Sequence, residues 1–279
     1  MNHRPVAPVT PAPWESLKRF TDARIALGRA GHSQTTAAHL AFQLAHAQAR
    51  DAVHLPLDAA TLSPELQALG MDVLPLHSAA PDREAYLQRP DWGRRLDAAS
   101  RERLLRWRQT QPGAGPVDLA FVVADGLSAL GVMQNAVPLL AHLLERLHAD
   151  AGQRWTLAPL VLVEQGRVAI GDEIGQVLGA RCVVVLIGER PGLSSPDSLG
   201  IYLSWAPRVG LNDAQRNCIS NVRNAGLPPE RAAVKLLTLL QQARLQGLTG
   251  VALKDETDEA VALPGHGPQV SLITGRPLA

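Results

Sequence analysis

The second half of this chain alternates apolar runs of strand length with segments of helical periodicity, and this alternation constrains the fold more than any other feature. The apolar runs are VDLAFVVAD (117–125), WTLAPLVLVEQ (155–165) and RCVVVLIGE (181–189), with GVALKD (250–255) as a last short strand. The helical segments are 126–150, 171–180, 214–226 and 228–247. Because strands that alternate with helices form parallel sheets covered on both faces, residues 112–279 are predicted to form an α/β, Rossmann-like, doubly wound domain with a mostly parallel sheet.

The first part of the chain has a different composition. Four prolines among residues 1–13 fix φ and remove backbone donors, so this leader is predicted to be extended and disordered. Alanine and leucine then recur at helical spacing, and helix breakers interrupt the later segments. Residues 14–111 are therefore expected to form an N-terminal helical extension without any strong strand, joined to the sheet domain by the linker QPGAGP (111–116).

Charge and cysteine content exclude several classes of protein. The chain has 279 residues and a formal net charge of +1, with acidic and basic residues interleaved, which argues against a nucleic-acid partner. No run approaches the roughly 20 apolar residues of a membrane span, and the first residues lack the apolar core of a signal peptide. Cys182 and Cys218 lack the spacing of a disulfide framework or a zinc site, so a reducing cytoplasm is expected.

Two patterns suggest catalysis or metal binding but have simpler interpretations. Ser128 in DGLSALG lies in a strand–turn–helix setting like that of a serine hydrolase, but the second glycine of G-x-S-x-G arrives one position late, at Gly131. A serine hydrolase that uses Ser128 remains an alternative to a serine that caps the helix. His32, His39 and His46 share one expected helical face, but neighbours lie roughly 10 Å apart, too far to share one metal ion.

The usual phosphate-binding motifs of nucleotide-binding sheets are absent from the sequence, since neither G-x-G-x-x-G nor G-x-x-x-x-G-K-[ST] occurs. The expected helix at 171–180 instead carries Gly171, Gly175 and Gly179 on one face, with Asp172 in its first turn, where a carboxylate suits the helix dipole. Each glycine costs about 1 kcal/mol of helix stability relative to alanine. We therefore expect this face either to pack closely on a strand or to receive a broad, flat ligand or partner.

The third strand ends in a long polar loop, LIGERPGLSSPDSLG (186–200), which carries Glu189, Arg190 and Asp197. In parallel sheets ligands bind beyond the carboxyl ends of the strands, so this loop marks a candidate binding edge. Cys218 in RNCISN begins the next expected helix, where an N-terminal position favours a thiolate. A catalytic cysteine needs a histidine base, and none is near in sequence, so Cys218 is interpreted as a packing or contact residue.

Four segments of the chain occur in an order that is specific to one enzyme family. They are RIALGRAG (24–31), VEQGRVAIGDEIGQVLGA (163–180), LIGERPGLSSPDSLGIYLSWAPRVG (186–210) and RNCISNVRNAGLPPERAA (216–233). In this order they closely resemble the small (light) subunit of ethanolamine ammonia-lyase. The resemblance covers nearly the whole chain apart from the leader.

The resemblance implies an adenosylcobalamin-dependent carbon–nitrogen lyase that is active only with a large, barrel-shaped subunit, in an oligomer of heterodimers. In that family the enzyme converts ethanolamine to acetaldehyde and ammonia by radical chemistry that the cofactor supplies. Carried over onto matching positions, the small subunit's cofactor contacts are Val168, Glu189 and Cys218. No catalytic residue is expected here, because the substrate pocket belongs to the large subunit. The family's cofactor is base-on, and this chain has no D-x-H-x-x-G motif, so no protein metal ligand is predicted.

The sequence leaves three questions open. The helical region 14–111 either packs on the large subunit or covers its own sheet. A non-catalytic module that binds cobalamin or a partner without turnover is a third alternative to the lyase subunit and the hydrolase. The complex lies either free in the cytoplasm or inside a bacterial microcompartment.

Overall fold

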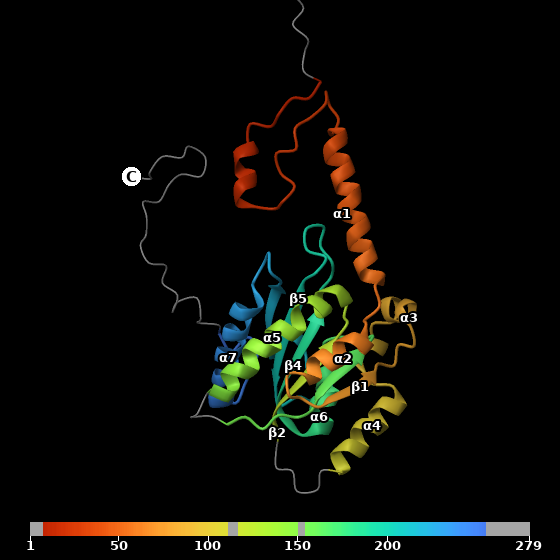
Figure 1. Ribbon diagram of the computed structural model, residues 1–279, viewed down its shortest axis with the longest axis vertical. Helices are drawn as coiled ribbons and strands as arrows, with labels where there is room; N and C mark the ends of the chain where they lie inside the picture. Colours follow the sequence, from red (N-terminus) through yellow and green to blue (C-terminus); the bar gives the residue numbers. More distant parts are fainter. Residues whose placement is uncertain (1–7, 111–116, 150–153, 255–279) are drawn as a thin grey trace, which may run out of the picture.

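The computed structural model describes residues 8–110, 117–149 and 154–254, which fold around one six-stranded sheet (Figure 1). Its order is β1-β3-β2-β4-β5-β6. The strands are β1 (Val73–His77), β2 (Val117–Ala124), β3 (Leu160–Glu164), β4 (Ala180–Gly188), β5 (Leu199–Trp205) and β6 (Arg216–Val222). The first four in this order are parallel, whereas β5 and β6 join as antiparallel strands. The prediction of an α/β fold with a mostly parallel sheet is confirmed.

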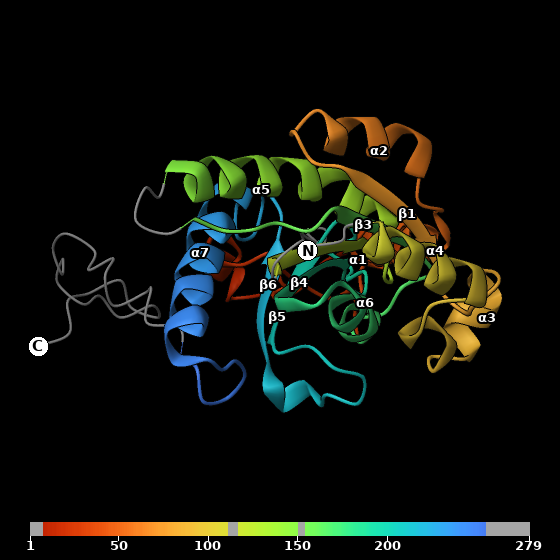
Figure 2. The same cartoon turned by 90° about the horizontal axis from the view of Figure 1, so that it is seen from below.

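Helices cover both faces of the sheet (Figure 2). One face packs against α2 (Ala59–Gln67), α5 (Ala129–Ala149) and α7 (Pro229–Gln246). The other face packs against α4 (Ala98–Gln109) and α6 (Ile170–Leu178). Every residue of β2 is buried, because this central strand lies between two helical layers. The remaining helices are α1 (Thr36–His54), α3 (Arg83–Gln88) and the 3-10 helices η1 (Glu15–Phe20), η2 (Trp92–Arg94) and η3 (Asp213–Gln215).

One strand comes from the N-terminal region. The expectation that this region holds no strong strand is wrong at β1, which pairs in parallel with β3. In β1 only Leu76 is buried, and Pro75 interrupts the run, so the strand lacks the continuous apolar pattern of a buried strand. Its place at the edge of the sheet explains both features, because an edge strand tolerates a missing backbone donor.

The chain after β4 also differs from expectation. Residues 199–205, expected within a long loop, form β5, and residues 216–222, expected as a helix, form β6. The buried residues of β6 are Arg216, Ile219 and Val222, and this spacing of three imitates one face of a helix. Backbone pairing with β5 overrides the pattern. Residues 250–254, expected to begin a last strand, form turns and bends.

Residues 8–54 form an arm that stands away from the sheet at the top of Figure 1. Within the predicted leader, Thr10 exchanges backbone hydrogen bonds with Arg29, while residues 1–7 lie outside the described residues, as does the linker 111–116. The later part of the N-terminal region behaves differently, since α2 and α4 pack on the sheet. Among the described helices, none is long and apolar enough to cross a membrane.

Candidate functional site

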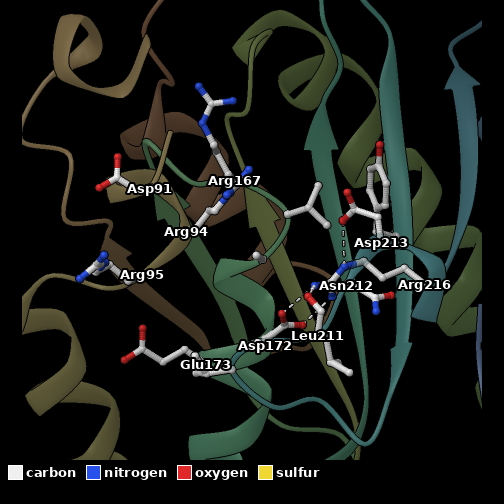
Figure 3. A pocket seen from close by; sticks show the side chains of 15 residues that line it. Asp91, Arg94, Arg95, Arg167, Asp172, Glu173, Leu211, Asn212, Asp213 and Arg216 are labelled. Carbon is white, nitrogen blue, oxygen red and sulfur yellow. Dashed lines mark hydrogen bonds and ion pairs between the residues drawn. The ribbon is translucent and has the colours of Figure 1, made fainter. Parts of the chain in front are cut away.

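Two adjoining pockets lie beyond the carboxyl ends of the parallel strands, the edge at which such sheets bind ligands. The larger, of about 940 Å³, runs from the loop after β3 along the start of α6 to the loop before β6 (Figure 3). The smaller, of about 400 Å³, lies over the ends of β2 and β4. Arg167, Val168 and Tyr202 line both pockets, so together they form one hollow, which we call the trough.

Val168 lies in the turn between β3 and α6. The turn is fixed by backbone hydrogen bonds, since the N–H of Arg167 donates to the Gly93 carbonyl at 2.8 Å and the Val168 carbonyl accepts from Gly171 at 3.1 Å. The Val168 side chain is half-buried and lines both pockets. It offers the trough an apolar contact held by a rigid backbone.

Glu189 follows the last residue of β4 and lines the smaller pocket. Its Oε2 accepts hydrogen bonds from the Ser198 hydroxyl and from the Asn221 backbone N–H, the latter at 3.1 Å. Its own N–H donates to the Ser198 carbonyl at 3.0 Å. The loop after β4 therefore returns to Glu189 and closes a connection to the antiparallel β5, with Arg190 lining the same pocket.

Cys218 lies on β6, directly opposite Tyr202 of β5. The expectation that it begins a helix is wrong, and so is the thiolate that a helix N-terminus would favour. Burial of the thiol beside Tyr202 raises the pKa of Cys218, although the residue as a whole is exposed. Burial likewise raises the pKa of Tyr202. Cys218 is therefore a neutral thiol, suited to contact rather than to nucleophilic attack.

The three residues predicted as cofactor contacts come from distant segments and meet around one side chain. Tyr202 lines the trough with Val168 and with Glu189, and it faces Cys218 across the β5–β6 pair. Gly200 has no side chain, and this leaves room for the side chains of Glu189 and Tyr202. A Cβ at this position would lie 3.0 Å from Glu189 Oε1 and 3.3 Å from the Tyr202 ring. Tyr202 was not singled out from the sequence, where it stands in a segment expected as loop.

A buried ion pair forms the base of the larger pocket. The Arg216 guanidinium donates to both carboxylate oxygens of Asp172, at 2.6 and 2.7 Å, and both side chains are almost fully buried (Figure 3). Arg216 also donates to Ser204 and to the Leu211 carbonyl. Burial raises the pKa of Asp172, and the bonds to Arg216 oppose that shift. Asp172 lies in the first turn of α6, as expected of a carboxylate that suits the helix dipole, but its main partner, Arg216, is 44 residues away.

The glycine face of α6 packs on protein. A Cβ at Gly171 would lie 2.4 Å from the Val185 side chain, and one at Gly175 would lie 2.6 Å from Pro207. Gly179 ends the helix in the left-handed conformation at φ 68°. Of the two alternatives for this face, helix-on-strand packing is confirmed, and a ligand-binding glycine face is wrong.

Ser128 has the contacts of a helix cap. Its Oγ accepts from the Gly131 backbone N–H at 3.1 Å and donates to the Pro196 carbonyl at 2.6 Å, and the side chain is fully buried. A hydroxyl engaged in this way cannot reach a substrate, which leaves the serine hydrolase without an accessible nucleophile. The capping interpretation is confirmed.

The three evenly spaced histidines do not form a site. His32 precedes α1, and only His39 and His46 lie within it. His46 stacks on Phe42, with ring centroids 6.1 Å apart. Within the described ranges, no group of three or more histidine, cysteine, aspartate or glutamate side chains is placed to hold a metal ion.

A second buried carboxylate fixes the loops at the edge of the trough. Asp125 accepts hydrogen bonds from the backbone of Gly126 and Gly166 at 2.9 and 3.0 Å, and it lies 3.6 Å from the Arg83 guanidinium. Burial raises its pKa to about 6, and backbone hydrogen bonds and Arg83 offset only part of that shift. Asp125 thereby ties the end of β2 to the loop after β3.

Comparison with known proteins gives one result over almost the entire chain. Residues 11–254 match the family of the ethanolamine ammonia-lyase light chain (EutC). The chain is 61% identical over 261 residues to the ethanolamine ammonia-lyase small subunit of Azotobacter vinelandii, covering 94% of each chain. It is 60% identical over 253 residues to that of Ralstonia nicotianae, covering 90% of this chain and 92% of the relative.

A relative with the same description from Pseudomonas putida is 59% identical over 251 residues, covering 90% of each chain. These matches extend across the arm, the sheet and all three predicted contact residues. The chain therefore belongs to the ethanolamine ammonia-lyase light chain (EutC) family and is the small subunit of a carbon–nitrogen lyase.

Proposed function

We propose that this small subunit and a large subunit together hold adenosylcobalamin at the trough, with Val168, Glu189 and Cys218 as this chain's contacts. The observation that carries the proposal is the convergence of these residues around Tyr202. They come from the β3–α6 turn, the end of β4 and the middle of β6, which are far apart in sequence and which the sheet brings together around one side chain.

The chemistry of the trough suits such a cofactor. The corrin ring carries amide side chains, which need both hydrogen-bond donors and acceptors. Glu189 Oε2 is used within the chain, but Oε1 has no hydrogen-bond partner among the described residues, so it can accept from an amide or a hydroxyl. Val168 and Tyr202 supply apolar surface, and Arg167 and Arg190 supply donors. An open trough of this size admits one side of a large ligand, and the partner subunit covers the other.

The cofactor, when bound, supplies the radical chemistry of ethanolamine deamination. This chain's residues bind and orient it and exclude water from one side. The resemblance to the family implies a base-on cofactor, for which this chain would supply binding contacts and no metal ligand. We assign no proton transfer and no metal ligand to this chain.

The arm is the best candidate for contact with the large subunit. In the region 14–111, α2 and α4 cover the chain's own sheet, whereas η1 and α1 project from it. Leu40, Phe42 and Leu44 are exposed on α1, as are Trp14 and Phe20 before it. Since soluble proteins seldom expose so many large apolar side chains together, we assign this surface to the interface in an oligomer of heterodimers. We place the complex in the cytoplasm, free or within a microcompartment.

Reconstitution tests the proposal as a whole. Ethanolamine deamination would be assayed with adenosylcobalamin for this chain alone, for a large subunit alone and for both together. Activity is expected only in the complete mixture. A complex of the correct size that binds the cofactor without turnover would instead favour the non-catalytic binding module.

Substitution of Glu189 tests the assigned contacts. In the reconstituted complex Glu189→Ala should weaken adenosylcobalamin binding roughly 10-fold, because a hydrogen bond to a charged group is lost. Equilibrium dialysis measures this affinity. Glu164→Gln is the matched control, because Glu164 is exposed at the end of β3 and lines neither pocket. Equal affinities for wild type and Glu189→Ala would remove Glu189 from the site.

The arm has its own test. Glutamate at two exposed positions, Leu40→Glu with Leu44→Glu, should lower affinity for the large subunit at least 10-fold, because charged groups would be desolvated in an apolar interface. Leu245→Glu is the control, since Leu245 is exposed on α7. Sizing of the mixed subunits measures assembly, and an unchanged affinity would move the interface elsewhere.

A further inference from the structure

The ring of Tyr86 is held between two guanidinium groups at the edge of the trough. Arg83 lies 4.7 Å and Arg167 lies 4.4 Å from the ring centroid. The ring is buried, and the Tyr86 hydroxyl donates to the Gly166 carbonyl at 3.3 Å. Tyr86 comes from α3 and Arg167 from the turn after β3, so the stack fixes the direction of both arginines.

Arg83 belongs to the framework of the protein. It donates to the Val53 carbonyl at 2.7 Å and to the Gly126 carbonyl at 2.8 Å, and the Asp125 carboxylate lies 3.6 Å away. Its charge is therefore compensated within the chain. Although its Nη2 is buried without a partner among the described residues, Arg83 lines neither pocket.

Arg167 is not compensated in this way. It donates to the Tyr86 carbonyl at 2.9 Å, but its Nε is buried without a hydrogen-bond partner, and no carboxylate of the described ranges lies within ion-pair distance. It lines both pockets, and Figure 3 shows its side chain pointing away from the Asp172–Arg216 pair. The half-buried guanidinium lines both pockets without a carboxylate counter-ion among the described residues, so an anion in the trough would compensate its charge.

The rest of the larger pocket does not supply that anion. Each carboxylate that lines it is engaged with an arginine. The pairs are Asp172–Arg216, Asp213–Arg216, Glu173–Arg101 and Asp91–Arg89. The remaining charged side chains of the lining are Arg94, Arg95 and Arg167. Arg216 serves two of these carboxylates, but with Arg89 and Arg101 the arginines in and beside the larger pocket still outnumber its carboxylates. The smaller pocket adds one carboxylate, Glu189, and one further arginine, Arg190. An anionic group of the ligand is therefore best placed at Arg167, beside Val168.

We propose that Arg167 binds the phosphodiester group of adenosylcobalamin. This inference rests on the proposed function and deepens it. The phosphodiester is the anionic group in the nucleotide loop of the cofactor, whereas the corrin side chains are neutral amides. A guanidinium whose plane is held by an aromatic ring presents its N–H groups as a rigid fork, which matches two phosphate oxygens better than it matches a single amide oxygen.

The test compares ligands that differ at the phosphate. The reconstituted complex is titrated by equilibrium dialysis with adenosylcobalamin, with adenosylcobinamide phosphate, which keeps a phosphate but lacks the base, and with adenosylcobinamide, which lacks both. Arg167→Gln should weaken binding of the first two roughly 10- to 100-fold and leave the third within about twofold. Arg167→Lys should show an intermediate loss, since it keeps the charge without the fork. Arg106→Gln on the exposed side of α4 removes the same charge and should change nothing.

Two results would overturn the inference. The first is that Arg167→Gln binds all three ligands as tightly as the wild type does. The second is that Arg167→Gln loses affinity equally for all three ligands, which would assign Arg167 to a corrin amide. Failure of the wild-type complex to bind adenosylcobalamin would instead refute the proposed function. If Arg167→Gln does not assemble, Arg167→Lys decides, because the proposal requires its affinity for adenosylcobalamin to fall more than its affinity for adenosylcobinamide.

Discussion

α1 and α5 are two long helices of similar length with opposite surroundings. α1 has 19 residues and α5 has 21, and alanine and leucine occur at helical spacing in both. In α5 the leucines at 139, 140, 143, 144 and 147 are buried. In α1, Leu40 and Leu44 are 57% and 62% exposed, and the buried residues are alanines.

The difference shows what a helical pattern can and cannot predict. Periodicity identifies a helix because side chains three and four residues apart share a face. It does not identify what covers that face. For α5 the cover is the sheet and α7 within the same chain. For α1 the described residues leave Leu40 and Leu44 uncovered, and we assign their cover to the large subunit.

The largest expected effect contrasts one leucine from each helix. Leu140→Ala in α5 should lower the free energy of unfolding by about 2–5 kcal/mol, because it leaves a cavity in a packed core. Leu44→Ala in α1 should lower it by less than about 0.5 kcal/mol in the chain without partner. Urea unfolding followed by circular dichroism measures both. Equal losses of stability would mean that Leu44 of α1 is packed in the isolated chain as firmly as Leu140 of α5 is.

The pH dependence of stability tests how firmly the start of α5 is anchored. Asp125, in the turn before α5, has a pKa raised by burial from 3.8 to about 6. Below about pH 3 the carboxyl is protonated in both states. As pH rises from about 3 to about 7 it ionises first in the unfolded state, so the folded state loses about 3 kcal/mol of relative stability.

Asp125→Asn removes this titration, so the free energy of unfolding of the wild type minus that of the variant should fall by about 3 kcal/mol between about pH 3 and pH 7. Urea unfolding at several pH values gives the difference and cancels the other titrating groups. A difference that rises with pH would show that Arg83 and the backbone donors outweigh burial. α1 has no comparable anchor, because the aspartate in it, Asp51, is exposed.

The smallest effect contrasts the caps of the two helices. Ser128→Ala should lower the free energy of unfolding by about 1–2 kcal/mol, because it removes the cap of α5 and leaves the half-buried Pro196 carbonyl without its donor. Thr35→Ala removes a single cap bond of 3.3 Å to Ala38 and should cost about 0.5–1 kcal/mol. Thermal unfolding ranks the two. The reconstituted complex with Ser128→Ala should also keep deamination activity, and its abolition in an assembled complex would reopen a catalytic role.

Local pattern alone determined the three adjoining parallel strands β3, β2 and β4 and the helices that follow them. The apolar runs of β2, β3 and β4 have no other stable place than a sheet covered on both faces, and α5, α6 and α7 follow from their periodicity. The family resemblance then pointed to Val168, Glu189 and Cys218, because motif residues are recognisable without knowledge of where they lie.

Only the tertiary structure decided the rest. β1 and β6 are strands because an ordered neighbour offers backbone partners, and their own side-chain patterns are ambiguous. Asp172 pairs with Arg216 and Tyr86 stacks on Arg167 across long stretches of sequence. The meeting of three contacts around Tyr202 has the same origin. Sequence patterns report the preferences of neighbouring residues, whereas pairing, burial and charge compensation depend on residues that folding alone brings together.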